Sequence, residues 1–142
     1  MSTAALFWPM FALVLLTAVV LVRLFRSRVR SVRSGSVTAS YFRAFQGGVE
    51  PEASVVLARH FANLFEAPTL FYVACITAMA LHAVTPATVG LAWLYVLARA
   101  AHSIVHLGRN RLKYRIRAYF ASWLILLALW IEVAVRIATS TL

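Results

Sequence analysis

The sequence is short of acidic residues and of cysteine, and both shortages limit what the chain can be. Four acidic residues stand against 14 Lys and Arg, which gives a formal net charge of +10. The single cysteine, Cys75, excludes an intrachain disulfide, and its apolar surroundings favour an inert packed thiol. With 63% hydrophobic residues, the chain of 142 residues is too apolar for an ordinary soluble domain. No repeat, low-complexity tract or change of composition divides it, so we predict one domain over residues 1–142.

Charge is also absent from long stretches, which predicts membrane-spanning helices. Residues 4–22 carry no charge, and a helix of that length nearly crosses a hydrocarbon core of about 30 Å. No basic residue precedes this run and no small-residue cleavage site follows it, so we expect a retained span rather than a signal peptide. Three further spans are predicted at residues 52–83, 87–106 and 112–138. We therefore predict an all-α membrane protein, folded as a four-transmembrane-helix bundle.

The basic residues predict the orientation of the bundle. Six Arg fall between residues 23 and 43, and five basic residues fall between 109 and 117. Basic clusters beside apolar spans are signals of membrane topology and of anionic lipid, and the absence of any nucleic-acid-binding motif argues against nucleic acid as a partner. The turn near Pro86 carries no Lys or Arg. We therefore expect the first and third loops to be cytoplasmic and both termini non-cytoplasmic, in a multi-pass protein of a bacterial inner membrane.

One group of polar residues lies at the start of the second span. Arg59, Asn63 and Glu66 are four and three residues apart, so on a helix they share one stripe. Polar groups in a span are costly and mark a bundle interior or a ligand path. Pro68 interrupts the hydrogen-bond ladder and predicts a kink just beyond Glu66. The structural alternative is a clasp in which Arg59 and Glu66 tie neighbouring helices together. Arginines that only contact lipid headgroups would leave Asn63 and Glu66 unexplained.

A second polar group lies at the end of the third span. Arg99, His102 and His106 recur at spacings of three and four, again on one helical face. In an antiparallel bundle this face lies at the depth of the early second helix, alongside Arg23 and Arg26. The sequence thus predicts a cytoplasm-facing pocket for a small polyanionic ligand, whose reaction partner arrives from the lipid.

The two histidines also allow a metal hypothesis. His102 and His106, with Glu66 nearby, have donor types that bind Zn²⁺ or Fe. Against this, only one carboxylate is expected near the pocket, and several Arg would repel a cation. We therefore predict no metal site, and we place His60 and His82 at the interface or at helix ends.

Both polar groups together resemble a known family. The pattern Arg59-x-x-x-Asn63-x-x-Glu66 resembles the signature of the MAPEG family, the membrane-associated proteins in eicosanoid and glutathione metabolism. Residues 97–108, followed by Arg115 and Tyr119, are similar to the matching region of the prostaglandin E synthase branch of this family. The motifs also resemble those of its glutathione transferase branch. The resemblance covers essentially the whole chain.

The resemblance implies a homotrimer that binds glutathione between adjacent subunits near the cytosolic face. In that arrangement Arg115 is the catalytic residue, because it stabilises the glutathione thiolate. The glutathione-binding positions that the resemblance implies are Arg23, Arg59, Asn63, Glu66, Arg99, His102, His106 and Tyr119, with Arg26 as the alternative to Arg23. The implied partners are glutathione, a lipophilic small molecule or lipid, and membrane lipids.

Two departures from the family pattern bear on the activity. His106 stands where a Tyr is common, and Ile116 stands where prostaglandin synthases have Ser. The second change removes a hydroxyl proposed to assist thiol activation. The resemblance therefore favours a glutathione transferase or peroxidase acting on a lipophilic electrophile, rather than a prostaglandin isomerase. The alternative is a non-catalytic lipid-binding or scaffold protein, as in the lipoxygenase-activating branch. A different small thiol, or a lipid headgroup, would also suit the charged pocket.

Overall fold

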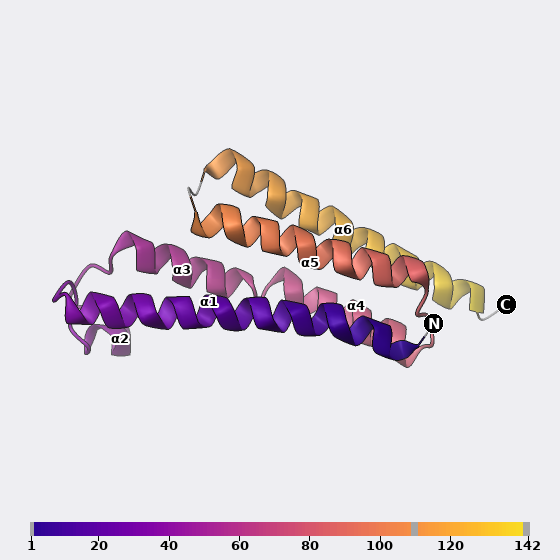
Figure 1. Ribbon diagram of the computed structural model, residues 1–142, viewed down its shortest axis with the longest axis horizontal. Coiled ribbons are helices and arrows are strands. Elements are labelled where there is room, and N and C mark those ends of the chain that lie inside the picture. Colours follow the sequence, from indigo (N-terminus) through magenta and orange to yellow (C-terminus); the bar gives the residue numbers. More distant parts are fainter. Residues whose placement is uncertain (1, 109–110, 141–142) are drawn as a thin grey trace.

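Four long helical segments make up the protein, as the computed structural model shows for residues 2–108 and 111–140 (Figure 1). The segments are η1 (Thr3–Leu6) with α1 (Phe7–Arg33), α3 (Glu52–Asn63) with α4 (Ala67–Ala80), α5 (Pro86–Leu107), and α6 (Leu112–Ser140). Each of the four is long and apolar enough to cross a membrane. The prediction of an all-α, four-span bundle is confirmed. Arg109 and Asn110, which belong to the predicted basic third loop, lie outside the described residues.

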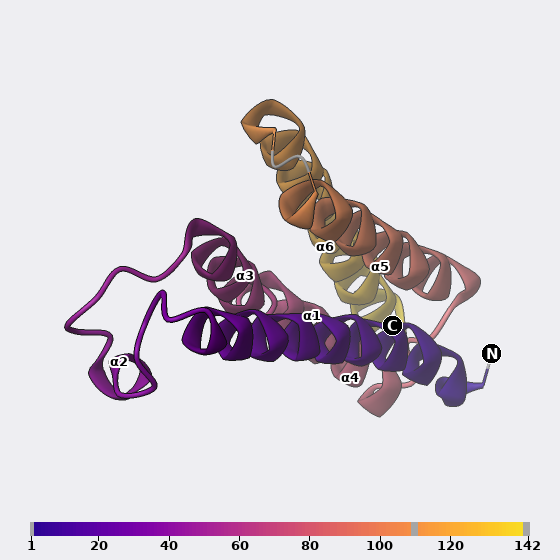
Figure 2. The same cartoon turned by 60° about the vertical axis from the view of Figure 1, so that its left-hand side comes forward.

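The segments alternate in direction, so the two ends of the bundle differ. Figure 1 shows η1 and the end of α6 at one end of the bundle, and the end of α1, the start of α3, the end of α5 and the start of α6 at the other. Helix α1 packs mainly on α3, and α5 mainly on α6. The α5–α6 pair crosses the α1–α3 pair at an angle (Figure 2). The basic first and third loops therefore share one side, as predicted; that this side is cytoplasmic stays a prediction.

The first loop folds back on α1 through its aromatic residues. It contains one short helix, α2 (Tyr41–Ala44). The Arg28 guanidinium lies over the Phe42 and Phe45 rings, at 5.2 and 5.5 Å from their centroids. The same guanidinium lies 3.6 Å from Glu50. Cation–π and ionic contacts thus hold this connection beside the start of α3.

The second span is broken, and the break lies earlier than the sequence predicted. Helix α3 ends at Asn63 and α4 begins at Ala67. Pro68 has no N–H for the carbonyl of Leu64, four residues before it, and its ring clashes with that carbonyl. The helix therefore ends upstream of the proline rather than kinking beyond Glu66. As a result Glu66, with ψ of −95°, is not on the helical stripe of Asn63.

The turn between α4 and α5 is fixed by a capping box. The Thr85 hydroxyl accepts from the Thr88 backbone N–H, and the Thr88 hydroxyl accepts from the Thr85 N–H. Pro86 occupies the first turn, where its missing N–H costs nothing. The Thr85 hydroxyl also lies 3.1 Å from a Glu132 oxygen, which ties the turn to α6.

Removing this cap is expected to destabilise the protein without touching the opposite end of the bundle. Thr85→Val keeps the side-chain volume but loses the cap, and should lower the free energy of unfolding by about 1 kcal/mol. Thermal unfolding in detergent measures the change. Thr38→Val, at an exposed loop threonine, is the matched control, and an equal effect of both substitutions would contradict the capping role.

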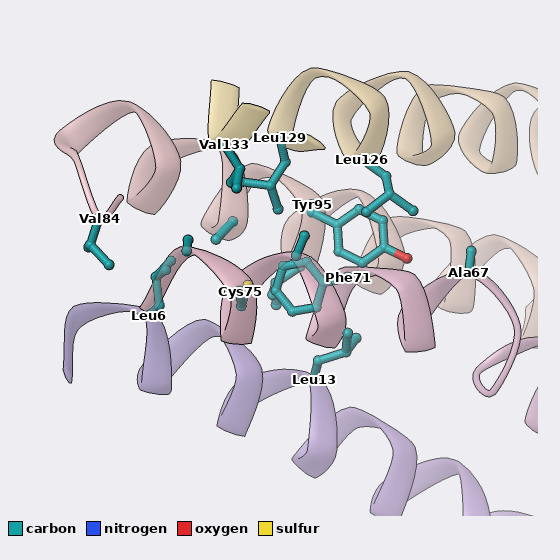
Figure 3. Packing of buried hydrophobic residues seen from close by; sticks show 14 residues of the cluster. Leu6, Leu13, Ala67, Phe71, Cys75, Val84, Tyr95, Leu126, Leu129 and Val133 are labelled. Atoms are coloured by element: carbon teal, nitrogen blue, oxygen red, sulfur yellow. The ribbon is translucent and has the colours of Figure 1, made fainter. Parts of the chain in front are cut away.

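The apolar core fills the half of the bundle that holds the chain ends. Phe71 of α4 stacks on Tyr95 of α5, with ring centroids 4.6 Å apart (Figure 3). Small residues such as Ala74 and Ala92 are fully buried and let the helices approach closely. Cys75 is also fully buried, as predicted. Toward the two basic loops this core gives way to polar side chains.

Candidate functional site

In α3, and in α5 from Arg99 to its loop end, the buried residues are polar. They are Ser54, His60, Arg99, His102, Ser103 and His106. Burying polar groups costs free energy unless they find partners. Apolar packing therefore does not explain why these residues are buried in this half of the bundle.

Arg99 holds the broken end of α3. Its side chain is fully buried, and its Nη2 donates to the Asn63 carbonyl oxygen at 3.1 Å and to Asn63 Oδ1 at 2.6 Å. Asn63 Nδ2 in turn lies 3.3 Å from Glu66 Oε2. The last carbonyls of a helix have no partner within it, so a guanidinium there satisfies a group that the break leaves open. A clasp between helices therefore exists, but Arg99 forms it rather than Arg59.

A pocket of about 410 Å³ lies next to this clasp, between α3, α5 and α6. Six of the predicted site residues line it: Arg59, Asn63, His102, His106, Arg115 and Tyr119. The other lining residues are Glu52, Val55, Val56, Ile116 and Phe120. The structure therefore brings two residues of each predicted polar group, together with Arg115 and Tyr119 of the last helix, around one cavity.

The charges of the pocket come from two walls. Arg59 projects from α3 and is exposed on the isolated chain, whereas Arg115 projects from α6 and is half-buried. Two guanidinium groups across one cavity suit an anionic ligand, since each presents a planar fork of donors to a carboxylate. Tyr119 adds a hydroxyl and lies against His102, with ring centroids 5.8 Å apart.

Three predicted residues do not line this pocket. Arg99 is enclosed behind it, and the exposed Glu66 reaches it only through Asn63. Arg23 lines a neighbouring cavity of about 380 Å³, which shares Glu52 and His106 with the main pocket. Arg26 instead lies in a separate groove with Arg30 and Arg33. Of the two candidates on the first helix, Arg23 is thus the one beside the site.

Glu52 lines the pocket but was not predicted as a site residue; in the sequence it marks only the start of the second span. It lines both the main pocket and the cavity of Arg23. The sequence could have identified Glu52 as a site residue, because it lies seven residues, or about two helical turns, before Arg59 and so shares the same face of the helix. The pocket therefore holds a carboxylate as well as two guanidinium groups.

His60 corrects the prediction that it lies at the interface or at a helix end. It is fully buried, and its Nε2 lies 2.9 Å from the Ser103 hydroxyl. Its ring centroid is 4.7 Å from that of His106 and 5.6 Å from that of His102. His60 follows Arg59 in the sequence and so points to a different face of α3, inward rather than into the pocket.

The comparison with known families identifies the family of the chain. The model of the family described as "MAPEG family" matches residues 6–135, which is most of the chain. Neither a curated protein nor a solved structure gave a match. The family match and the four spans make this a multi-pass integral membrane protein. The chain belongs to the MAPEG family.

Proposed function

We propose that this protein is a glutathione-dependent membrane transferase or peroxidase that acts on a lipophilic electrophile. Membership of the family supports a glutathione-related transferase or synthase in the membrane. The observation that carries the proposal is that Arg59 of α3 and Arg115 of α6 line one pocket, together with Asn63 and Tyr119.

The pocket offers a complementary group for each charged part of glutathione. Arg59 binds a carboxylate through paired N–H donors, and Asn63 adds an amide. Glu52 accepts from the α-ammonium group, with Glu66 as the family-implied alternative. Arg115 stabilises negative charge on the sulfur, which matters because a free thiol with a pKa of about 8.5 is mostly protonated at neutral pH. Glutathione supplies the nucleophilic sulfur. At an electrophilic carbon, the sulfur forms a thioether and displaces a leaving group or adds to a double bond. At a peroxide, the sulfur breaks the O–O bond, releases an alcohol and becomes a sulfenic acid, which a second glutathione converts into disulfide and water.

A second cavity next to the pocket suits the lipophilic partner. It has a volume of about 340 Å³ and lies along α6 and Leu70 of α4. Its lining is apolar: Leu70, Phe120, Trp123, Leu124, Leu126, Leu127 and Trp130. Phe120 lines both this apolar cavity and the charged pocket. A hydrophobic electrophile that enters from the lipid would thus reach the sulfur past Phe120.

This route predicts a role for Phe120 in recognising the electrophile. Phe120→Ala removes apolar surface shared by the two cavities and should raise KM for a long-chain electrophile about tenfold, which is about 1.4 kcal/mol of binding. KM for glutathione should stay unchanged. Phe25→Ala, at an equally exposed phenylalanine on α1, is the matched control in steady-state assays. Equal effects of the two substitutions would contradict the route.

We further propose that the site is completed in a homotrimer and faces the cytoplasm. Arg23, Arg59 and Glu66 are exposed on the isolated chain. Charged side chains at membrane depth are costly unless they meet partners or a water-filled cavity. Contacts between adjacent subunits would supply those partners, as the family resemblance implies.

The test of the proposed function is turnover. Purified protein in detergent, given glutathione and a generic aromatic electrophile, should form the thioether conjugate at a rate proportional to the protein present. The second candidate is a non-catalytic lipid-binding protein, which the apolar groove favours. That candidate predicts no conjugation above the spontaneous rate, and such a result would reject the enzyme.

A further inference from the structure

We propose that His60, His102 and His106 bind a divalent transition-metal cation of the zinc class, with one coordination position open toward the charged pocket. All three side chains are buried. One ring nitrogen from each lies within 4.8 Å of the others. His102 and His106 line the pocket whereas His60 lies behind them, so an ion among the three would be approached from the pocket side.

The hydrogen bonds of His60 leave it ready to ligate through Nδ1. The Ser103 hydroxyl donates to the Arg99 carbonyl oxygen at 2.9 Å, so its single proton is already used. It must therefore accept from His60 Nε2, which lies 2.9 Å away. This fixes the proton on Nε2 and leaves a lone pair on Nδ1. A hydrogen bond from the non-ligating nitrogen is also what orients histidine ligands in metal sites.

The cluster contains buried ring nitrogens that nothing else in the described chain satisfies. His60 Nδ1 and His106 Nδ1 have no hydrogen-bond partner there. The His102 ring makes no hydrogen bond of normal geometry, although it lies close to the Arg115 backbone. Buried polar atoms are rarely left without a partner, and each such case needs an explanation. A bound cation accounts for one nitrogen of each ring at once.

The geometry needs only a small adjustment to hold an ion. His102 and His106 are one helical turn apart on α5, and His60 faces them from α3. Zn–N bonds of about 2.0–2.1 Å in a tetrahedron place the nitrogens roughly 3.3 Å apart. The rings must therefore approach by no more than about 1.5 Å. Rotation about the side-chain bonds provides movements of this size.

Two nearby charges decide which ions are suitable. Arg115 lines the pocket, and the buried Arg99 guanidinium lies on the same helix as two of the ligands. Such charges disfavour Mg²⁺ and Ca²⁺, which bind chiefly by electrostatics and prefer oxygen. Zn²⁺, Co²⁺, Ni²⁺ and Cu²⁺ gain more from imidazole nitrogen. An anionic fourth ligand from the pocket side, hydroxide or thiolate, offsets the positive charge. From the sequence, a metal site was predicted to be absent, because only one carboxylate was expected near the two histidines and several Arg would repel a cation. The inward position of His60 supplies a third neutral ligand in place of that carboxylate.

The direct test is to titrate Co²⁺ into chelator-treated, tag-free protein in detergent. We expect one Co²⁺ per chain, with the visible absorption of four-coordinate cobalt, and its displacement by Zn²⁺. His60→Asn should weaken Co²⁺ binding at least about tenfold, since even the loss of an outer-shell partner costs that much. His82→Asn makes the same substitution at an exposed histidine in the turn after α4, and should bind Co²⁺ as the unchanged protein does.

Absence of stoichiometric Co²⁺ in the unchanged protein overturns the inference, as does wild-type affinity in His60→Asn. If His60→Asn is not recovered as a folded helical protein, His106→Asn is compared with His82→Asn under the same criteria. The inference does not rest on glutathione. Co²⁺ binding without conjugation would keep the metal site and reject the proposed enzyme, and conjugation by metal-free protein that fails to bind Co²⁺ would do the reverse.

Discussion

Replacing Arg115 with glutamine is expected to lower kcat/KM for glutathione conjugation about hundredfold at neutral pH. Removing one group that stabilises a developing or full negative charge typically costs a factor of about 10²–10³. The loss should shrink as the pH rises, because the thiol then ionises without help at its ordinary pKa of about 8.5. Steady-state rates with an aromatic electrophile across the pH range measure both effects.

Arg117→Gln is the matched control for this prediction. Arg117 lies on the same helix, is exposed, and does not line the pocket. Its substitution should leave both the rate and its pH dependence as they are. If Arg115→Gln behaved like Arg117→Gln, the assignment of Arg115 to the thiolate would be wrong. A loss that is equal at every pH would assign Arg115 to ligand binding instead.

Replacing Arg59 with glutamine is expected to remove at least about half of the protection that glutathione gives against thermal unfolding. A ligand at about 100 times its Kd stabilises the folded protein by about 2.7 kcal/mol. A charge-assisted hydrogen bond to a carboxylate contributes about 1.5–3 kcal/mol, so its loss raises Kd at least about tenfold. The shift of the unfolding midpoint with glutathione concentration, in detergent, gives the affinity of each variant.

Arg33→Gln is the control here, because Arg33 lies in a separate groove at the end of α1. It should show the full glutathione-dependent shift. If glutathione protected Arg59→Gln as well as it protects the unchanged protein, the glutathione carboxylate would not bind at Arg59 of α3. No protection of the unchanged protein would favour a site for lipid alone.

Apolar runs and residue spacing were enough to predict the helices and much of the pocket. Uncharged runs of membrane-spanning length predict helices whatever the tertiary packing, because a backbone in lipid must satisfy its own hydrogen bonds. The spacing of Arg59 and Asn63, and of His102 and His106, placed each pair on one face. All four line the pocket.

The remaining details depend on contacts between residues far apart in the sequence. Asn63 accepts from Arg99, 36 residues away, and His60 contacts Ser103, 43 residues away. Those contacts are set by how α3 and α5 are rotated about their axes, which spacing within one helix does not determine. The break at residues 64–66 was also not predictable from spacing, and it removes Glu66 from the helical stripe of Asn63. A periodic pattern read across residues 59–66 assumes an unbroken helix there.

The most direct measurement of the central claim is the ultraviolet absorption of thiolate in the protein–glutathione complex, at a pH about two units below the pKa of the free thiol. Binding should produce one thiolate per occupied site, and Arg115→Gln should bind glutathione without producing it. Glutathione that binds in full, yet stays a thiol in the unchanged protein, would contradict the account.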